Sequence, residues 1–404
     1  MIVVSKFSSE WVNNANEIVA DVSHPELPEK LFFRCQGSFS YAEKIKSGNG
    51  ILLSLLWPAM ELGEDLFIEG EVTDELLFVA NNDLQSLLLD YEPKLKRILV
   101  SAIKVTSNIE RSNRRVATGF SAGVDSFTTL KIFSAGSAPA SKVVNTITTF
   151  NVGAMGGVTE SAGLFEKYCS RTIDFSKKYS LSWTSIDSNL DDFFKFKNSG
   201  FQKTHVLRNV AAAYLMEAEV SNYLYSSSYP FADLNKNNFD MSFIEPILLS
   251  LVSTRSMNFE SAGAGLSRLQ KTKLISGFEP AFEWLDVCVS DPLARATGKF
   301  PNCSRCWKCS RLIITLDALH KLDNFKAVLD GEKFKQFKGR AYRQIVRGAL
   351  KGRPADRDVI QFICEQGVGL SSQWHVTMKY YLNNVMKKIK KGANLAARKF
   401  VFFK

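Results

Sequence analysis

The pattern of hydrophobic and polar positions changes along the chain at about residue 111. Before that point, short apolar runs such as Ile51–Trp57, Asp65–Ile68 and Leu76–Val79 alternate with Gly, Asn and Asp, which is typical of short strands joined by turns. The spacing of leucines over Asp83–Lys96 instead predicts a short amphipathic helix. Residues 1–110 are therefore predicted to form a strand-rich accessory domain of mixed α/β type.

After residue 111, predicted strands and helices alternate. The strands cover 116–120, 143–150, 181–186 and 223–227, and the helices cover 125–133, 160–179 and 204–218. This alternation predicts an α/β fold with a parallel, doubly wound sheet. Ligands bind such sheets beyond the carboxyl ends of the strands. A further helix is predicted over 310–322, so that one domain extends over 111–325.

The positive charge is concentrated at the end of the sequence. The net charge is +10, yet residues 331–404 alone carry 17 Lys and Arg against four acidic residues, so that the first 330 residues are slightly acidic. Residues 326–404 are predicted to be a basic, mostly helical segment. Its last part, from Met386 to Lys404, mixes lysine with phenylalanine and is a candidate for contact with nucleic acid or an anionic membrane, the alternative being a solvated helix.

The chain begins without the basic and apolar stretches of a signal peptide. Its longest apolar runs, Ile51–Trp57 and Ile244–Val252, are far shorter than the ~20 residues that span a bilayer. A cytoplasmic location is expected. Seven cysteines in such a chain do not indicate a disulfide framework, and metal binding is the first interpretation to consider for those that are clustered.

The segment Phe120-Ser-Ala-Gly-Val-Asp-Ser126 lies between a predicted strand and a predicted helix. Small side chains let backbone N–H groups close on an anion at the start of a helix. Asp125 can hold a Mg²⁺ that bridges phosphate oxygens, and the hydroxyls of Ser121 and Ser126 can donate hydrogen bonds to them. The segment therefore indicates a phosphate-binding loop, and a tight turn capped by Asp125 is the alternative. The Gly-Lys-Ser/Thr ending of a Walker loop is missing.

A second motif is formed by cysteines. Cys303, Cys306 and Cys309 have the spacing C-x2-C-x2-C, and Cys288 lies fifteen residues before the first of them. Four thiolates at such spacings can close a tetrahedral Zn²⁺ site, which would be structural because no coordination position stays open. An iron–sulfur cluster, a redox pair and unrelated reduced cysteines are the alternatives.

The phosphate loop followed about 180 residues later by the cysteine motif resembles the PP-loop ATP pyrophosphatases of the HUP fold type, and within them the 7-cyano-7-deazaguanine synthase family. The resemblance covers residues 111–325. It implies an enzyme that uses ATP, Mg²⁺ and Zn²⁺ and releases AMP and pyrophosphate. Such an enzyme adenylates a carboxylate or carbonyl oxygen, and ammonia or another nucleophile then displaces AMP. The residues that it implies at the nucleotide are Ser121, Ala122, Gly123, Val124, Asp125, Ser126 and Phe150.

This chain departs from the family at three places. Ala122 stands where the family usually has Gly, so a positive φ at this position would strain the loop. The gap between Cys288 and Cys303 is longer than the family's, and residues 1–110 and the basic segment have no counterpart. We therefore expect a divergent member with a larger or different acceptor.

Other side chains are weaker candidates. Arg208 can neutralise phosphate charge during adenylation and, with Asp125 and Ser126, is a predicted catalytic residue; its neighbour His205 is a candidate on the same helix. Candidates to bind a phosphate or carboxylate are Ser253, Thr254, Arg255, Arg268 and Lys271. Two alternative functions stay open: an RNA-modifying enzyme such as a tRNA thiolase, and an ATP-binding subunit or sensor of a larger complex such as a bacterial defence system. A homodimer is a further possibility.

Overall fold

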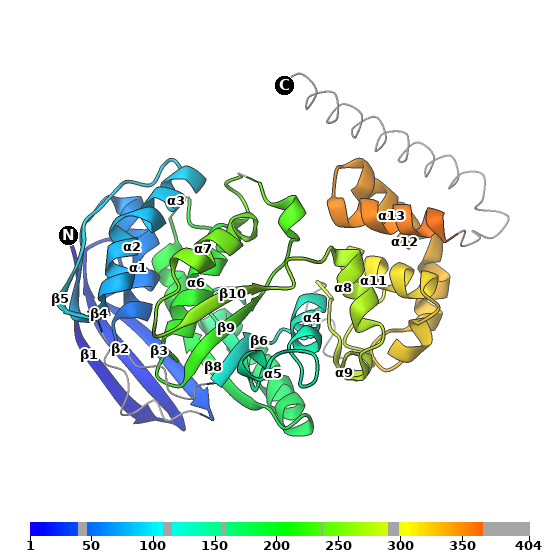
Figure 1. Cartoon of the computed structure of the whole chain (residues 1–404), viewed down its shortest axis with the longest axis horizontal. Coiled ribbons are helices and arrows are strands. Elements are labelled where there is room, and N and C mark those ends of the chain that lie inside the picture. Colours follow the sequence, from blue (N-terminus) through cyan, green and yellow to red (C-terminus); the bar gives the residue numbers. More distant parts are fainter. Residues whose placement is uncertain are drawn as a thin grey trace, which may run out of the picture. The chain divides into compact units, whose positions relative to one another are not determined.

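The computed structural model describes residues 1–38, 47–107, 115–155, 158–196, 198–235, 237–289 and 299–366. Within these residues the protein is of mixed α/β type and contains a 10-stranded, mostly parallel sheet (Figure 1). The strands are β1 (Ile2–Val12), β2 (Ala15–Ser23), β3 (Lys30–Gly37), β4 (Leu66–Thr73), β5 (Val100–Thr106), β6 (Arg115–Gly119), β7 (Thr146–Asn151), β8 (Ser182–Ser188), β9 (Val220–Ser226) and β10 (Asn258–Ala262). Their order across the sheet is β10-β9-β6-β7-β8-β3-β2-β1-β4-β5. The predicted α/β class is confirmed.

Strands β6 to β10 form a parallel array whose order reverses at its first strand. β7 and β8 follow on one side of β6, and β9 and β10 follow on the other. The crossover helices are α5 (Val158–Lys178), α6 (Phe201–Tyr214) and α7 (Glu245–Leu251). Figure 1 shows α5 and α6 on opposite faces of this array. Sheets of this kind bind ligands where the strand order reverses, which here lies between β6 and β9.

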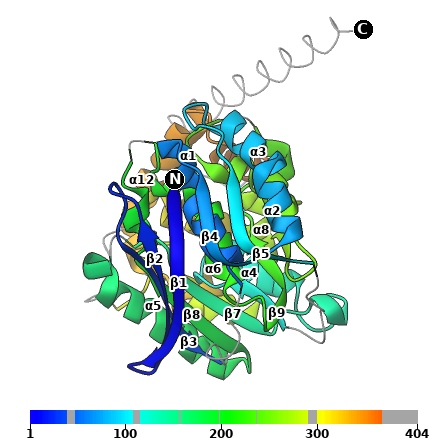
Figure 2. The same ribbon diagram turned by 90° about the vertical axis from the view of Figure 1, so that its left-hand side faces the viewer.

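The strands of the first 110 residues belong to the same sheet and do not form a separate one. β3 runs antiparallel to β8, with Phe33 opposite Ser188 and Gly37 opposite Thr184. β2 pairs with β3 and β1 pairs with β2, both antiparallel. β4 then pairs with β1 and β5 pairs with β4, both parallel, so that β5 is an edge strand of the sheet (Figure 2). The backbone hydrogen bonds of β8 therefore connect the predicted accessory region to the parallel array.

Two of the predicted strands are helices. Ile51–Trp57 lies within α1 (Asn49–Leu62), and Leu76–Val79 lies within α2 (Asp74–Asn81). Twelve of the fourteen residues of α1 are buried, and an apolar run buried on all sides reads the same in a helix as in a strand. The predicted helix after them is confirmed in part as α3 (Asp83–Tyr91).

The described residues divide into two compact units. Unit 1 comprises Met1–Ser121 and Ile132–Ala264, and unit 2 comprises Ala122–Lys131 and Gly265–Lys404. These units differ from the predicted segments 1–110, 111–325 and 326–404. The sheet joins the first of those segments to the parallel array, and the helices that follow residue 325 pack on those that precede it.

Unit 2 is helical in its described part. Its helices are α4 (Val124–Ile132), α8 (Arg268–Ile275), α9 (Glu279–Trp284), α11 (Trp307–Ala318), α12 (Gly331–Leu350) and α13 (Pro354–Glu365). α11, α12 and α13 pack on one another, and α8 packs on α11 and α13. The predicted helix 310–322 corresponds to α11. Residues 367–404, which include the predicted basic end, lie outside the described residues.

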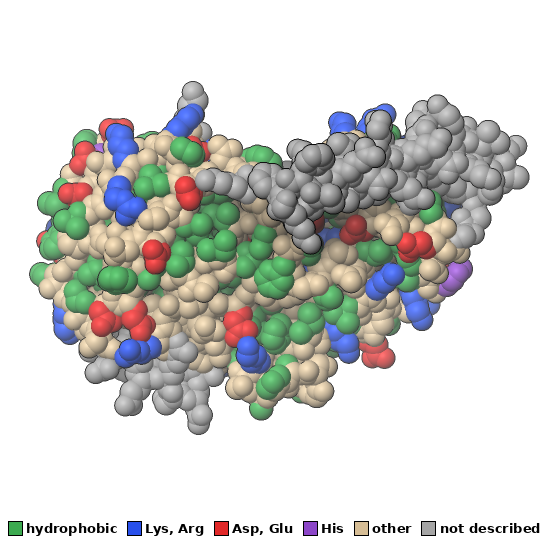
Figure 3. Space-filling model, turned by 45° about the horizontal axis from the view of Figure 1, so that its top comes forward, with side chains coloured by type: hydrophobic (Ala, Val, Ile, Leu, Met, Phe, Trp, Pro, Cys, Tyr) green, Lys and Arg blue, Asp and Glu red, His purple; other side chains and the backbone are tan. Residues whose placement is uncertain are grey.

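Short 3-10 helices complete the described structure. They cover Ala140–Lys142, Leu190–Phe194, Phe231–Asp233, Met241–Phe243 and Leu322–Phe325. On the face drawn in Figure 3, hydrophobic, acidic and basic side chains of described residues are interspersed. Across the described ranges, none of the helices combines the length and the hydropathy that a bilayer-spanning segment needs.

Candidate functional site

The segment predicted to be a phosphate loop follows β6 and leads into α4, so its position between a strand and a helix is as predicted. Ala122 is 3% exposed and has φ of 56°, in the left-handed region. This conformation costs a residue with a side chain roughly 1–2 kcal/mol. Glycine, which the family usually has at this position, would adopt this conformation freely. The departure from the family therefore falls at a residue whose backbone conformation favours glycine.

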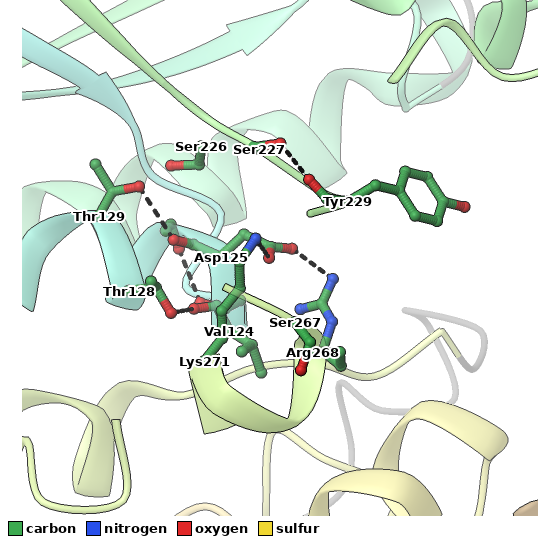
Figure 4. Close-up of polar contacts among 12 residues, drawn as sticks. Val124, Asp125, Thr128, Thr129, Ser226, Ser227, Tyr229, Ser267, Arg268 and Lys271 are labelled. Atoms are coloured by element: carbon green, nitrogen blue, oxygen red, sulfur yellow. Dashed lines mark hydrogen bonds and ion pairs between the residues drawn. The ribbon is translucent and has the colours of Figure 1, made fainter. Parts of the chain in front are cut away.

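Asp125, in the first turn of α4, is held by two cations of unit 2. Its Oδ2 lies 2.7 Å from Nη2 of Arg268, and its Oδ1 lies 3.1 Å from Nζ of Lys271. Lys271 is only 1% exposed. Figure 4 shows the pair of Asp125 with Arg268. The structure thus joins the predicted magnesium ligand to two of the weaker candidates.

The start of α8 positions these two cations. Ser267 caps the helix, because its Oγ accepts a hydrogen bond from the backbone N–H of Gln270. In return, the side-chain oxygen of Gln270 accepts a hydrogen bond from the backbone N–H of Ser267. This capping box fixes the first turn. Residues three apart lie on the same side of a helix, so Arg268 and Lys271 both reach the carboxylate.

A third cation, Lys308, lies near this group. Desolvation lowers the pKa of Lys308, and the positive charge of Arg268 lowers it further, whereas Asp125 acts in the opposite direction. Two cations therefore pair with one carboxylate, and the charge of Lys308 acts on Arg268 and Asp125 of this group; the surplus positive charge suits an anion.

Ser126 and Ser121 differ in their surroundings. Ser126 is 2% exposed, and its hydroxyl donates to the carbonyl oxygen of Gly123 at 3.0 Å. Ser121 is exposed. A contact of either hydroxyl with phosphate stays a prediction.

In unit 1, hydroxyl groups gather where the strand order reverses. The Oγ1 of Thr118 on β6 donates to the carbonyl oxygen of Leu224 at 2.7 Å and lies 3.4 Å from Oγ of Ser226. Ser227 follows β9, and its Oγ donates to the carbonyl oxygen of Tyr229 at 2.9 Å (Figure 4). The sequence analysis missed these serines, although they end a strand that it had predicted and could have been found from that position.

Phe150 lies on β7 and packs against the core of unit 1. Its ring stacks on Tyr223, with the centroids 6.0 Å apart and the planes at 17°. The structure therefore accounts for this side chain by packing, and its contact with adenine stays a prediction.

Arg208 is a buried residue that donates four hydrogen bonds. It is 1% exposed, and Nη1 lies 2.6 Å from Oδ1 of Asp191 and 3.1 Å from the carbonyl oxygen of Val152. Nε and Nη2 donate to Thr204 and to the carbonyl oxygen of Ser199. Burial lowers its pKa, and Asp191 counteracts this shift. The structure gives Arg208 the role of fixing the loop after β7, and a contact with phosphate stays a prediction.

The four cysteines of the second motif lie together in unit 2. The sulfurs of Cys288, Cys303, Cys306 and Cys309 are all within 4.8 Å of one another. The Cys288–Cys306 and Cys303–Cys309 pairs are each 3.9 Å apart. Sulfurs bound to one tetrahedral Zn²⁺ at 2.3 Å lie about 3.8 Å apart, and a disulfide would need about 2.05 Å. The group could therefore hold a metal ion such as zinc.

Backbone and amide groups fix the loops that carry these sulfurs. The N–H groups of Cys303 and Cys306 point at the sulfurs of Cys288 and Cys303, at 3.5 and 3.3 Å. Asn302 is 2% exposed and donates to the carbonyl oxygens of Leu285 and Val328. Outer contacts of this kind orient metal ligands.

The electrostatics of the sulfurs also fit a cation. The thiol of Cys288 is the first contributor to a raised pKa at both Cys306 and Cys309; Cys303 and Cys306 raise the pKa of Cys309 further, whereas Cys309 lowers that of Cys306. Four negative sulfurs repel one another unless a positive ion lies between them. A metal ion would therefore bind as the thiols lose their protons.

The loop of the first cysteine contacts the phosphate loop directly. The N–H of Asp286 donates to the carbonyl oxygen of Ala122 at 2.8 Å. Together with Lys308, which lies between Cys306 and Cys309, this bond brings the two predicted motifs into one region of unit 2.

Neither a protein-family model, nor a curated protein, nor a solved structure matches this chain.

Proposed function

We propose that the protein is an ATP-dependent enzyme of the PP-loop type that forms AMP and pyrophosphate. The observation that carries the proposal is the pairing of Arg268 and Lys271 with Asp125, at the first turn of the helix that follows the loop. Cations beside backbone N–H groups are what a polyphosphate needs. The strand order, which reverses at β6, supports the same proposal.

In the proposed site each group has one task. Arg268, Lys271 and Lys308 bind phosphate oxygens, which releases Asp125 from its ion pairs to hold Mg²⁺. An oxygen of the acceptor attacks the α-phosphorus, the bond from that phosphorus to the bridging oxygen breaks, and pyrophosphate leaves. Ammonia or another nucleophile then displaces AMP from the acceptor. The proposal includes the resemblance of this chain to the 7-cyano-7-deazaguanine synthase family.

Zinc is the metal that we propose for the four cysteines. A closed four-thiolate site leaves no position for substrate, so the ion would be structural. Through Asp286 and Lys308 it would stabilise the neighbourhood of the phosphate loop.

The test uses purified protein, Mg²⁺ and ATP labelled at the α-phosphate, with and without cell extract. We expect AMP and pyrophosphate to form only when extract supplies an acceptor, and Asp125→Ala to abolish their formation. Asp192→Ala, which removes a surface carboxylate paired with Lys195, serves as the matched control and should retain activity. ADP as the specific product would overturn the proposal.

A second candidate is a subunit that binds ATP without cleaving it. Two observations favour it: the left-handed conformation of Ala122 and the engagement of Asp125 by two cations, which a magnesium ion would have to displace. ATP binding with no AMP formed across varied extracts would select this candidate.

A further inference from the structure

Helix α12 of unit 2 has a basic exposed face. The helix contains six Lys or Arg and one acidic residue, Glu332. Its apolar side chains, among them Phe334, Ile345 and Val346, are buried against α11 and α13. Arg340 and Arg347 are exposed, as is Lys351, which ends the helix. These three positions are seven and four residues apart and so lie along one side of the helix.

Basic residues on and beside α12 differ in their partners. Lys335 pairs with Glu332 at 2.7 Å, and Lys338 pairs with Asp317 at 2.8 Å. In contrast, Arg340, Arg347 and Lys351 have no acidic partner within the described ranges. Among the described residues, therefore, no carboxylate compensates the charge of these three, whereas that of the two lysines is compensated.

The same surface continues beyond the end of α12. Arg357 on α13 is exposed and lacks an acidic partner among the residues that the structure describes. Its guanidinium lies beside Gly352, next to Lys351. A favourable contact with the helix dipole accounts for a cation at the last turn of α12, but not for Arg340, more than two turns earlier, nor for Arg357 on another helix.

We propose that this basic face, formed by Arg340, Arg347, Lys351 and Arg357, binds the phosphate backbone of a nucleic-acid duplex. Arg340 and Lys351 are about 17 Å apart along the helix axis at 1.5 Å per residue. A strand of duplex carries a phosphate about every 3.4 Å along its axis, so several phosphates come within reach. Guanidinium groups suit phosphate because they donate paired hydrogen bonds.

The side chains of α12 argue against other anionic partners. A helix that lies on a membrane inserts an apolar face into the bilayer, whereas here Phe334, Ile345 and Val346 are buried within the protein, and the half-buried Phe337 and the exposed Leu350 lie thirteen residues apart. Proteins that bind single strands stack bases on aromatic rings, whereas on α12 Tyr342 is buried and Phe337 is half-buried. The basic face therefore offers mainly charge, and binding should not depend on base sequence.

The experiment measures binding of the full-length protein to labelled RNA and DNA duplexes by fluorescence anisotropy, between about 50 and 200 mM salt. Arg340→Gln, Arg347→Gln and Lys351→Gln are combined in one variant. Each phosphate contact contributes about 0.9 to the slope of log K against log salt for a duplex, so the slope should become shallower by almost three. The RNA and DNA arms show which duplex binds more tightly.

A matched variant combines Lys6→Gln, Lys94→Gln and Lys104→Gln, three exposed residues of unit 1. It loses the same charge and should keep the slope of the unmodified protein. Asp125→Ala should also keep it, because this inference does not depend on the ATP site. Equal slopes for the α12 variant and the unmodified protein would overturn the proposal. Binding to anionic vesicles with none to either duplex would overturn it in favour of a membrane.

Discussion

The cysteine cluster and Asp125 of the predicted phosphate loop lie in the same compact unit, and both were predicted from short motifs, yet their contacts are completed in different ways. All four sulfurs come from residues 288–309 and meet within 4.8 Å. Asp125 of the loop is instead paired with Arg268 and Lys271, which follow it by 143 and 146 residues. A metal motif carries its ligands in one stretch of sequence, whereas an anion site receives its charges from wherever the fold brings them.

This difference has a consequence for stability. Metal ligands that are close in sequence form a site only when their loops are folded, so metal binding and folding are coupled. The cations of the phosphate loop are held by the capped helix α8 and by one carboxylate. We therefore expect loss of the metal to unfold structure, and loss of the carboxylate mainly to change function.

The largest expected effect is that of removing a cysteine sulfur. Cys309 is fully buried, and Cys309→Ser should lose the bound metal. Structural zinc contributes apparent binding free energies of about 10–16 kcal/mol in small domains, as much as the entire stability of a typical domain, about 5–15 kcal/mol. Unit 2 should therefore lose helix content, as measured by circular dichroism, and become more sensitive to limited proteolysis. Metal analysis of the variant should find less zinc than in the unmodified protein.

Cys364→Ser is the control, because this thiol is exposed and outside the cluster; it should retain zinc and helix content. A Cys309→Ser protein with its full complement of zinc would refute the assignment. Iron and acid-labile sulfide found in the unmodified protein would mean that the cysteines hold an iron–sulfur cluster instead of zinc.

The next effect in size is that of Asp125→Asn. We expect AMP formation to fall about 100-fold or more, equivalent to about 2.7 kcal/mol in the barrier, because the magnesium ligand is lost. Stability should fall as well, because Lys271, 1% exposed, is left without its carboxylate; breaking a buried pair on one side costs about 3–5 kcal/mol, and the partial exposure of Asp125 reduces this figure.

The double variant Asp125→Asn, Lys271→Met separates these two roles. Replacing the lysine removes the uncompensated charge and should restore much of the stability, measured by urea unfolding. AMP formation should stay lost. Recovery of activity together with stability would mean that Asp125 acts only through the fold.

The sequence was most informative where the pattern was local. Alternating strands and helices predicted the parallel array, and the spacing of cysteines predicted a site that the structure assembles. The run Ile51–Trp57 was assigned wrongly because complete burial removes the periodicity that separates a helix from a strand. The pairing of β3 with β8 joins residues about 150 positions apart, and no local pattern encodes such a pairing.

In the candidate site, too, local motifs could be predicted from the sequence, whereas contacts between distant segments could not. Asp125 was singled out because it stands in a motif, whereas Arg268 and Lys271 were weaker candidates to bind a phosphate or carboxylate, and no local pattern linked them to Asp125. Arg208 shows the converse. It had the residue type and helix position of a catalytic group, but the fold surrounds it with fixed acceptors. Burial and saturation of hydrogen bonds depend on distant segments and are therefore not visible in the sequence.

The smallest effect that we predict concerns Ala122 itself. Ala122→Gly relieves a left-handed backbone worth roughly 1–2 kcal/mol, but it removes a buried methyl group worth about 0.8 kcal/mol. It also increases the conformational entropy of the unfolded chain, which lowers the free energy of unfolding by about 0.5–1 kcal/mol. The three terms nearly cancel, so the free energy of unfolding should change by less than about 1 kcal/mol.

Ala122→Val tests the conformation from the other direction. A β-branched residue tolerates a positive φ poorly, and its extra carbons would enter a site that is 3% exposed; overpacking of this kind costs about 1–3 kcal/mol. We expect a loss of about 2 kcal/mol or more by urea unfolding, with little change for Ala140→Val at an exposed position. An Ala122→Val protein as stable as the unmodified one would mean that the loop does not adopt the left-handed turn, and the phosphate loop would then lose the feature that most constrains its sequence.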